Sequence, residues 1–417
     1  MYNPDALVPS TDGAPAAPDF CMKTPLSFLL AATLLAPTLT FANTVAAPIA
    51  APAAAPASFV PPPPEIAGKA YFLNDFNSQL PIAVRDPDLR VDPASLTKLM
   101  TAYLTFKALR EKRLSLEQTL LVSAKGWKTE GSRMFLDPKT PVTVSDLIRG
   151  MIVQSGNDAC VTLAEAIAGS EEVFAQMMTA EAKRLGMTGT NFKNSAGMPD
   201  PDHYTTVADL AKLSAAIIHD FPEFYPIYSM KEFTYNNGRK SHTQPNRNLL
   251  LYRDAFVDGL KTGHTASAGY NLIASTRRND RRLVSVVVGT TGEEVRAQES
   301  AKLLNWGVQF FETPKITAAR QVVATPKVWK GAAEQVQAGF LGDLYVTLDR
   351  GETAALKKEV VLNEPLIAPI KQGQAVGKMK VTLNGKPVGE YPLVALQPVE
   401  EGGFFRRLID MIKLWFR

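Results

Sequence analysis

Ser95 and Lys98 form the only S-x-x-K motif of this chain, and their residue types and spacing suit serine acyl transfer. Apolar residues follow at spacings of three and four: Leu96, Leu99, Met100, Tyr103 and Leu104. This pattern predicts an amphipathic helix near 95–110, so Lys98 would lie on the same face as Ser95. A hydroxyl and an amine one turn apart can share a proton, which makes Ser95 a candidate nucleophile and Lys98 a candidate base.

Lys98 can accept a proton only when it is neutral, so we expect burial and a nearby cation to lower its pKa. The triplet Lys261-Thr262-Gly263, at the end of a predicted strand over 255–262, is the candidate source of that cation. Lys261 would also attract a carboxylate and Thr262 would offer a hydroxyl. Gly263 would let a substrate backbone approach the strand.

Ser155-Gly156-Asn157 lies between these two motifs, in a break between predicted helices near 145–153 and 158–168. Each motif is weak or moderate evidence alone. Their order, S-x-x-K, S-x-N and K-T-G, with separations of 60 and 106 residues, is strong evidence for a serine enzyme with a lysine base.

Over about residues 66–417 the sequence resembles the penicillin-binding D-alanyl-D-alanine carboxypeptidases, low-molecular-mass serine peptidases of peptidoglycan. The similar stretches are 92–98, 131–136, 154–159, 246–248 and 258–265. The resemblance implies an α/β sandwich of the β-lactamase/transpeptidase type, followed by a small all-β domain and a C-terminal amphipathic helix. It implies no cofactor and no metal.

The resemblance also implies a role for each motif residue. Ser95 would attack the carbonyl between two terminal D-alanines and release D-alanine from an acyl-enzyme. Lys98 would be its base, although the base of this superfamily is disputed. Ser155 and Lys261 would pass a proton to the leaving amine, and Asn157 would hold the substrate amide.

The same resemblance assigns the remaining site residues. Backbone N–H groups of Ser95 and His264 would form the oxyanion hole, and Thr262 and Arg296 would bind the terminal carboxylate. The alternative for Arg296 is a solvated charge on a helix. The partners implied are the peptidoglycan pentapeptide and, as covalent inhibitors, β-lactams. The middle motif is S-G-N and no E-x-x-L-N lies between Ser155 and Lys261, so penicillins should stay bound for long periods.

Helical and strand patterns alternate through the predicted catalytic domain, residues 65–315. Further helices are predicted near 171–185, 207–219 and 293–311, and further strands over 268–277 and 282–290. The arginine-rich run 277–282 is interpreted as a solvated hairpin tip. Cys160 is interpreted as a small core residue. The order of elements indicates an α/β sandwich with one antiparallel sheet.

After residue 315 short β-type runs predominate, at 344–348 and 378–383, and Asn384-Gly385 is typical of a hairpin turn. They predict an all-β domain over 316–400. Residues 401–417 contain a glycine pair, Gly402-Gly403, and continue as an amphipathic helix with basic residues opposite the apolar ones. This helix would be a peripheral anchor in a membrane surface; the alternative is core or oligomer packing.

The first 64 residues contain 13 of the 30 prolines and are not expected to fold as a domain. Residues 1–42 are interpreted as an extension and a secretory signal, with the true start at Met22 and cleavage after Ala42. Residues 43–64 would be an Ala/Pro-rich linker. The expected location is the periplasm, on the outer face of the cytoplasmic membrane.

Composition excludes several other classes. A formal charge of +4, from 45 basic and 41 acidic residues, argues against a nucleic-acid partner. Two cysteines build no disulfide framework, and the four histidines form no H-E-x-x-H zinc motif. The competing functions are an endopeptidase of D-alanyl cross-links and a non-catalytic cell-wall scaffold.

Overall fold

The computed structural model describes residues 60–416. The predicted signal peptide and most of the predicted linker over 43–64 lie outside the described residues.

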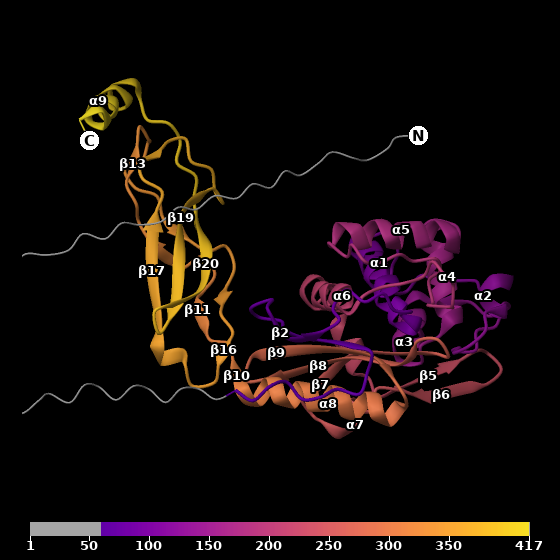
Figure 1. Cartoon of the computed structure of the whole chain (residues 1–417). Coiled ribbons are helices and arrows are strands. Elements are labelled where there is room, and N and C mark those ends of the chain that lie inside the picture. The colour runs from indigo at the N-terminus through magenta and orange to yellow at the C-terminus, as the bar shows by residue number, and fades with distance from the viewer. Residues whose placement is uncertain (1–59, 417) are drawn as a thin grey trace, which may run out of the picture. The chain divides into compact units, whose positions relative to one another are not determined.

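The predicted antiparallel sheet is present in the first part of the described chain. Its five strands follow the order β2 (Pro81–Arg85), β1 (Ala70–Asp75), β9 (Arg281–Thr290), β8 (Gly269–Arg278) and β7 (Val257–Thr265). Every neighbouring pair is antiparallel. Strands β8 and β9 are buried along nearly their whole length, because helices cover both faces of the sheet. Figure 1 shows α8 (Glu293–Phe310) on one face and a cluster of helices on the other.

The helical cluster matches the predicted helices within about two residues. It contains α1 (Lys98–Arg110), α3 (Val144–Val153), α4 (Asn157–Ala168), α5 (Glu171–Arg184) and α6 (Val207–Asp220). The side chains of Thr143, Ser170 and Thr206 accept N–H bonds at the starts of α3, α5 and α6, which fixes these boundaries. The short helix α2 (Ala124–Lys128) and the hairpin of β5 (Glu232–Asn236) and β6 (Ser241–Pro245) were not predicted.

The arginine-rich hairpin corrects one prediction. Only Asn279 and Asp280, both with positive φ, make the turn between β8 and β9. Arg281 donates to Asp75 at 2.7 Å, and Arg282 donates to both oxygens of Asp258 at 2.6 and 2.7 Å.

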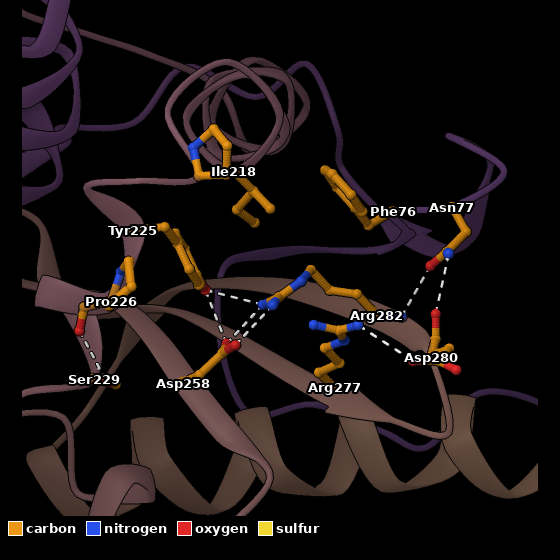
Figure 2. A pocket seen from close by; sticks show the side chains of 11 residues that line it. Phe76, Asn77, Ile218, Tyr225, Pro226, Ser229, Asp258, Arg277, Asp280 and Arg282 are labelled. Carbon is orange, nitrogen blue, oxygen red and sulfur yellow. Dashed lines mark hydrogen bonds and ion pairs between the residues drawn. The ribbon is translucent and has the colours of Figure 1, made fainter. Parts of the chain in front are cut away.

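The side chains of both arginines are about nine-tenths buried. Figure 2 shows Arg282 pointing to Asp258 and to the hydroxyl of Tyr225, which lies 3.1 Å away. Because β9 starts immediately after the turn, its first two residues, Arg281 and Arg282, lie within the sheet. The interpretation of these two arginines as solvated was wrong.

The last part of the chain has its own sheet, in the order β12 (Val322–Ala324), β14 (Ala338–Gly339), β20 (Lys386–Ala395), β19 (Ala375–Leu383) and β17 (Leu356–Leu362). Val376, Val381 and Leu393 are completely buried in its core. Asn384 and Gly385 both have positive φ and connect β19 to β20, as the N-G turn predicts.

The run 344–348 is not one strand, contrary to the prediction. It is divided into β15 (Leu344–Tyr345) and β16 (Leu348–Asp349), which pair with different partners. The partner of β15 is β11 (Lys315–Thr317), and that of β16 is β10 (Phe311–Glu312).

The predicted C-terminal helix is α9 (Phe404–Trp415). Its polar side faces the protein: the carboxylate of Asp410 accepts a hydrogen bond from the backbone N–H of Lys330 at 2.6 Å. Its exposed apolar residues, and the one that follows it, are Phe404, Phe405, Leu408, Ile409, Met411, Ile412, Trp415 and Phe416. No residue of α9 is buried, so it is not a core helix. Within residues 60–416, no helix has the length and apolar character needed to cross a membrane.

Candidate active site

Ser95 lies in the 3-10 turn η1 (Ala94–Thr97), which continues directly into α1. Lys98 is the first residue of α1, and its Nζ lies 2.8 Å from Ser95 Oγ. The same Nζ donates to the backbone carbonyl of Ala196 at 2.6 Å, and the side chain of Lys98 is almost completely buried. The predicted contact between hydroxyl and amine is therefore present in the structure.

Two glycines allow this turn to pack tightly. A Cβ on Gly197 would lie 1.7 Å from the carbonyl oxygen of Ala94, and one on Gly263 would lie 3.0 Å from that of Pro93. Ala94 itself has a φ of +47°, a strained conformation next to the nucleophile. Gly263 thus lets β7 approach η1, and the approach of a substrate backbone to this strand stays a prediction.

The S-x-N and K-T-G motifs also lie in contact with each other. Ser155 lies between α3 and α4 with a φ of +61°, and its Oγ is 3.0 Å from Lys261 Nζ. Lys261 and Thr262 are both buried residues of β7. The S-x-N serine and the K-T-G lysine therefore form a second hydroxyl–amine pair.

Burial, with a smaller contribution from the positive charge of Arg247, lowers the pKa of Lys98 to about 8. The pKa of Lys261 is well below its ordinary value because the group is buried and faces the charge of Lys98. The cation expected beside Lys98 was Lys261, whose charge does interact with that of Lys98, and the structure adds Arg247 as a second cation. Arg247 was missed as a functional residue because the sequence offered only its place in the stretch 246–248.

Asn157 begins α4 and forms one wall of the site. Its Nδ2 donates to the backbone carbonyl of Glu130 at 2.6 Å, and its backbone N–H donates to the carbonyl of Ser132 at 2.7 Å. Its Oδ1 is buried and has no hydrogen-bond partner among residues 60–416. This oxygen can therefore accept an N–H from a bound ligand.

Arg296 and His264 lie at the other end of the site. The guanidinium of Arg296 is 3.5 Å from the carbonyl of Gly263 and 3.4 Å from that of Arg247. Arg296 is buried, which excludes its interpretation as a solvated helix charge. The ring of His264 packs against Tyr270 at 4.0 Å between centroids.

Cys160 is buried in α4, and its Sγ contacts the backbone carbonyl of Gly156 at 3.2 Å. Burial raises the pKa of its thiol to about 12, so it does not compete with Ser95 as a nucleophile. The prediction of a core cysteine is confirmed. Within the described part of the chain, no group of three or more His, Cys, Asp or Glu side chains could hold a metal ion.

Comparison with protein families gives two adjacent matches. Residues 57–292 match the D-alanyl-D-alanine carboxypeptidase family, peptidase S11. Residues 311–401 match the C-terminal domain of penicillin-binding protein 5. The two matches agree with a catalytic part that is followed by a small all-β part.

Individual relatives match over most of their length. D-alanyl-D-alanine carboxypeptidase DacC of Escherichia coli is 43% identical over 361 residues, covering 85% of this chain and 89% of the relative. DacA of the same organism is 40% identical over 367 residues, covering 86% and 90%. The crystal structure of penicillin-binding protein 5 from Haemophilus influenzae superimposes with a TM-score of 0.77 at 40% identity, covering 81% of this chain and 99% of that one. The chain therefore belongs to the peptidase S11 family of D-alanyl-D-alanine carboxypeptidases.

Proposed function

We propose that this protein is a serine D-alanyl-D-alanine carboxypeptidase that removes the terminal D-alanine of peptidoglycan pentapeptide stems. The observation that carries the proposal is the pair of hydroxyl–amine contacts in one site. Ser95 lies 2.8 Å from Lys98, and Ser155 lies 3.0 Å from Lys261.

Acylation uses both pairs. Neutral Lys98 takes the proton of Ser95, and Oγ attacks the carbonyl carbon of the penultimate D-alanine. The backbone N–H groups of Ser95 and His264 stabilise the oxyanion. When the C–N bond breaks, the proton held by Lys98 passes through Ser155 and Lys261 to the nitrogen, and D-alanine leaves.

Substrate orientation follows from the two ends of the site. Thr262 and the buried Arg296 bind the terminal carboxylate, which a guanidinium can hold with two hydrogen bonds. The unpaired Oδ1 of Asn157 accepts a hydrogen bond from the backbone N–H of the penultimate D-alanine, the residue whose carbonyl is attacked. Water then hydrolyses the ester on Ser95: neutral Lys98 takes one proton from the attacking water and gives it to the Ser95 oxygen as the acyl group leaves.

Penicillins imitate the terminal dipeptide and acylate Ser95 in the same way. The amine released by ring opening stays attached to the acyl group, so it remains in the site and hinders water. With no E-x-x-L-N carboxylate between Ser155 and Lys261 to activate that water, the acyl-enzyme persists.

Labelling with a fluorescent penicillin tests the nucleophile. Ser95→Ala should abolish labelling, and Ser155→Ala should slow it. The exposed Ser229, whose hydroxyl donates to the nearby carbonyl of Pro226, provides a matched Ser229→Ala control that should label normally. Undiminished labelling of Ser95→Ala would refute the assignment.

Product analysis separates the competing activities. The protein without residues 402–417 is incubated with pentapeptide muropeptides and with cross-linked dimers. A carboxypeptidase releases free D-alanine, an endopeptidase converts dimers into monomers, and a scaffold does neither.

We further propose that the enzyme acts in the periplasm and that α9 attaches it to the outer face of the cytoplasmic membrane. At 1.5 Å per residue, its 12 residues extend about 18 Å, which suits a helix lying in the interface. The apolar side is exposed, whereas Asp410 faces the protein. Arg406 and Arg407 form ion pairs with Glu334 and Glu401, whereas Lys413 adds attraction to anionic lipid.

Vesicle sedimentation tests the anchor. The protein should pellet with anionic vesicles, and Ile409→Glu or deletion of 402–417 should leave it in the supernatant. Lys240→Ala, an exposed charge change outside α9, is the control. Continued pelleting of the deletion variant would contradict the proposal.

Amino-terminal sequencing of exported protein tests cleavage after Ala42.

A further inference from the structure

A pocket of about 590 Å³ lies beside the catalytic residues and has no part in the chemistry described above. Its walls come from α2, from the segment 133–139 and from the hairpin β5–β6. The side chains that line it include Trp127, Phe135 and His242, with Arg133, Lys139 and Arg239 among them. The ring of His242 stacks on Phe135 at 4.5 Å between centroids. We call this space the stem pocket.

The stem pocket begins where the wall of the active site ends. Ser132 belongs to that wall: its carbonyl accepts the N–H of Asn157, and its hydroxyl accepts from Arg247 at 2.9 Å. The next residue, Arg133, already lines the pocket. Its carbonyl accepts from Gln244 of β6 at 2.9 Å, which ties the segment to the hairpin.

The charges of the pocket do not balance. Asp137 is paired with Arg239 at 2.9 Å. The carboxylate of Asp158 is buried and accepts two backbone N–H groups of the segment, those of Met134 and Leu136, at 3.0 and 3.2 Å.

Arg133 and Lys139 remain, and neither forms an ion pair with any residue in the range 60–416. Both are exposed, and the Arg133 guanidinium lies 5.7 Å from the centroid of the Phe135 ring. The pocket thus offers two available cations against aromatic walls, which suits an anionic group on a peptide.

The polarity of the substrate indicates what reaches this pocket. The terminal carboxylate lies at the Arg296 end and the scissile residue lies near Asn157. The peptide that precedes the scissile pair therefore passes Asn157 toward Arg133. Extended peptide advances about 3.3 Å per residue, so one or two residues are enough to enter the pocket.

We propose that the stem pocket binds a carboxylate of the stem peptide upstream of D-alanyl-D-alanine, and that Arg133 and Lys139 give the enzyme its preference for acidic stems. This inference rests on the proposed function. The carboxylate has two sources: the α-carboxylate of a γ-linked D-glutamate and the side-chain carboxylate of a diaminopimelate.

The test compares kcat/KM for D-alanine release from four pentapeptides. One carries both carboxylates, one has the D-glutamate amidated, one has lysine in place of diaminopimelate, and a neutral stem lacks both. The ratio of acidic to neutral substrate should fall about tenfold in Arg133→Ala/Lys139→Ala, equivalent to about 1.4 kcal/mol. Arg133→Lys should retain most of the ratio, and 0.5 M salt should reduce it in the wild-type enzyme.

Lys240→Ala, which removes an exposed charge from the same hairpin outside the pocket, is the matched control and should keep the wild-type ratio. The amidated stem and the lysine stem identify which carboxylate the pocket binds. Removing the bound carboxylate lowers kcat/KM, whereas removing the other one does not. An equal ratio in the double variant and the wild type would overturn the inference while the proposed function stands. Failure to release D-alanine from all four stems would overturn the proposed function itself.

Discussion

The pH dependence of Ser95 acylation should report the pKa of Lys98. Only neutral Lys98 can accept the serine proton, so the rate of acylation should follow the neutral fraction. With a pKa of about 8, that fraction is about 9% at pH 7 and about 1% at pH 6. An ordinary lysine of pKa 10.5 would be about 0.03% neutral at pH 7, so the lowered pKa supplies roughly 300 times more base.

The assay is the second-order rate of fluorescent-penicillin labelling between pH 6 and 9.5. Because the proton must be lost for activity, the rate should rise about tenfold from pH 6 to pH 7 and level off above about 8. Arg247→Gln removes a positive charge that lowers this pKa. The bend in the pH profile, the pH at which the rate levels off, should then move to higher pH. The rate should be lower than that of the wild type at pH 7 and equal to it near pH 9.5.

Lys240→Ala removes an exposed charge on the β5–β6 hairpin and should leave the bend in place. Circular dichroism at each pH excludes unfolding as the cause of a lower rate. A rate that does not change between pH 6 and 7, or an unmoved bend in Arg247→Gln, would refute the role given to Lys98 and its neighbouring charge.

Three further predictions concern stability and reactivity. Arg282→Ala leaves the partly buried Asp258 without its ion pair and should lower the free energy of unfolding by about 3 kcal/mol, measured in urea; a change below about 0.5 kcal/mol would contradict this. Gly197→Ala places a Cβ against the carbonyl of Ala94 and should reduce both the melting temperature and penicillin labelling. Normal labelling would show that the backbone around Gly197 can move without disturbing Ser95, which would contradict this prediction. Cys160 should react with a thiol reagent only after denaturation, and rapid reaction of the native protein would contradict its burial.

The sequence predicted those elements whose signals are local. Thr143, Ser170 and Thr206 cap helices whose apolar periodicity is also strong, and Asn384-Gly385 determines a turn by its own backbone preferences. The hairpin β5–β6 was missed although β5 alternates the buried Phe233 and Tyr235 with exposed polar residues, which is the pattern of a half-buried strand. Its partner β6 has no large apolar residue, so its own sequence gives no strand signal.

In the candidate site, too, local sequence predicted some contacts and the tertiary fold determined the others. The pairing of Ser95 with Lys98 follows from one helical turn, so it could be predicted. The pairing of Ser155 with Lys261, 106 residues apart, was expected only from the family resemblance. Arg247 acts on Lys98 through the tertiary fold, and its neighbours in sequence give no sign of this. The domain boundaries at 315 and 400 remain predictions.

The tight contacts of η1 with Gly197 and Gly263 restrict how this enzyme can evolve under antibiotic selection. Neither glycine can be replaced without moving the backbone that carries the nucleophile. Variants that escape penicillin by distorting this turn would also lose the reaction with the natural substrate. Tolerated changes should instead accumulate in the exposed segment around Arg133, where the contacts of a long stem peptide and of a compact drug differ.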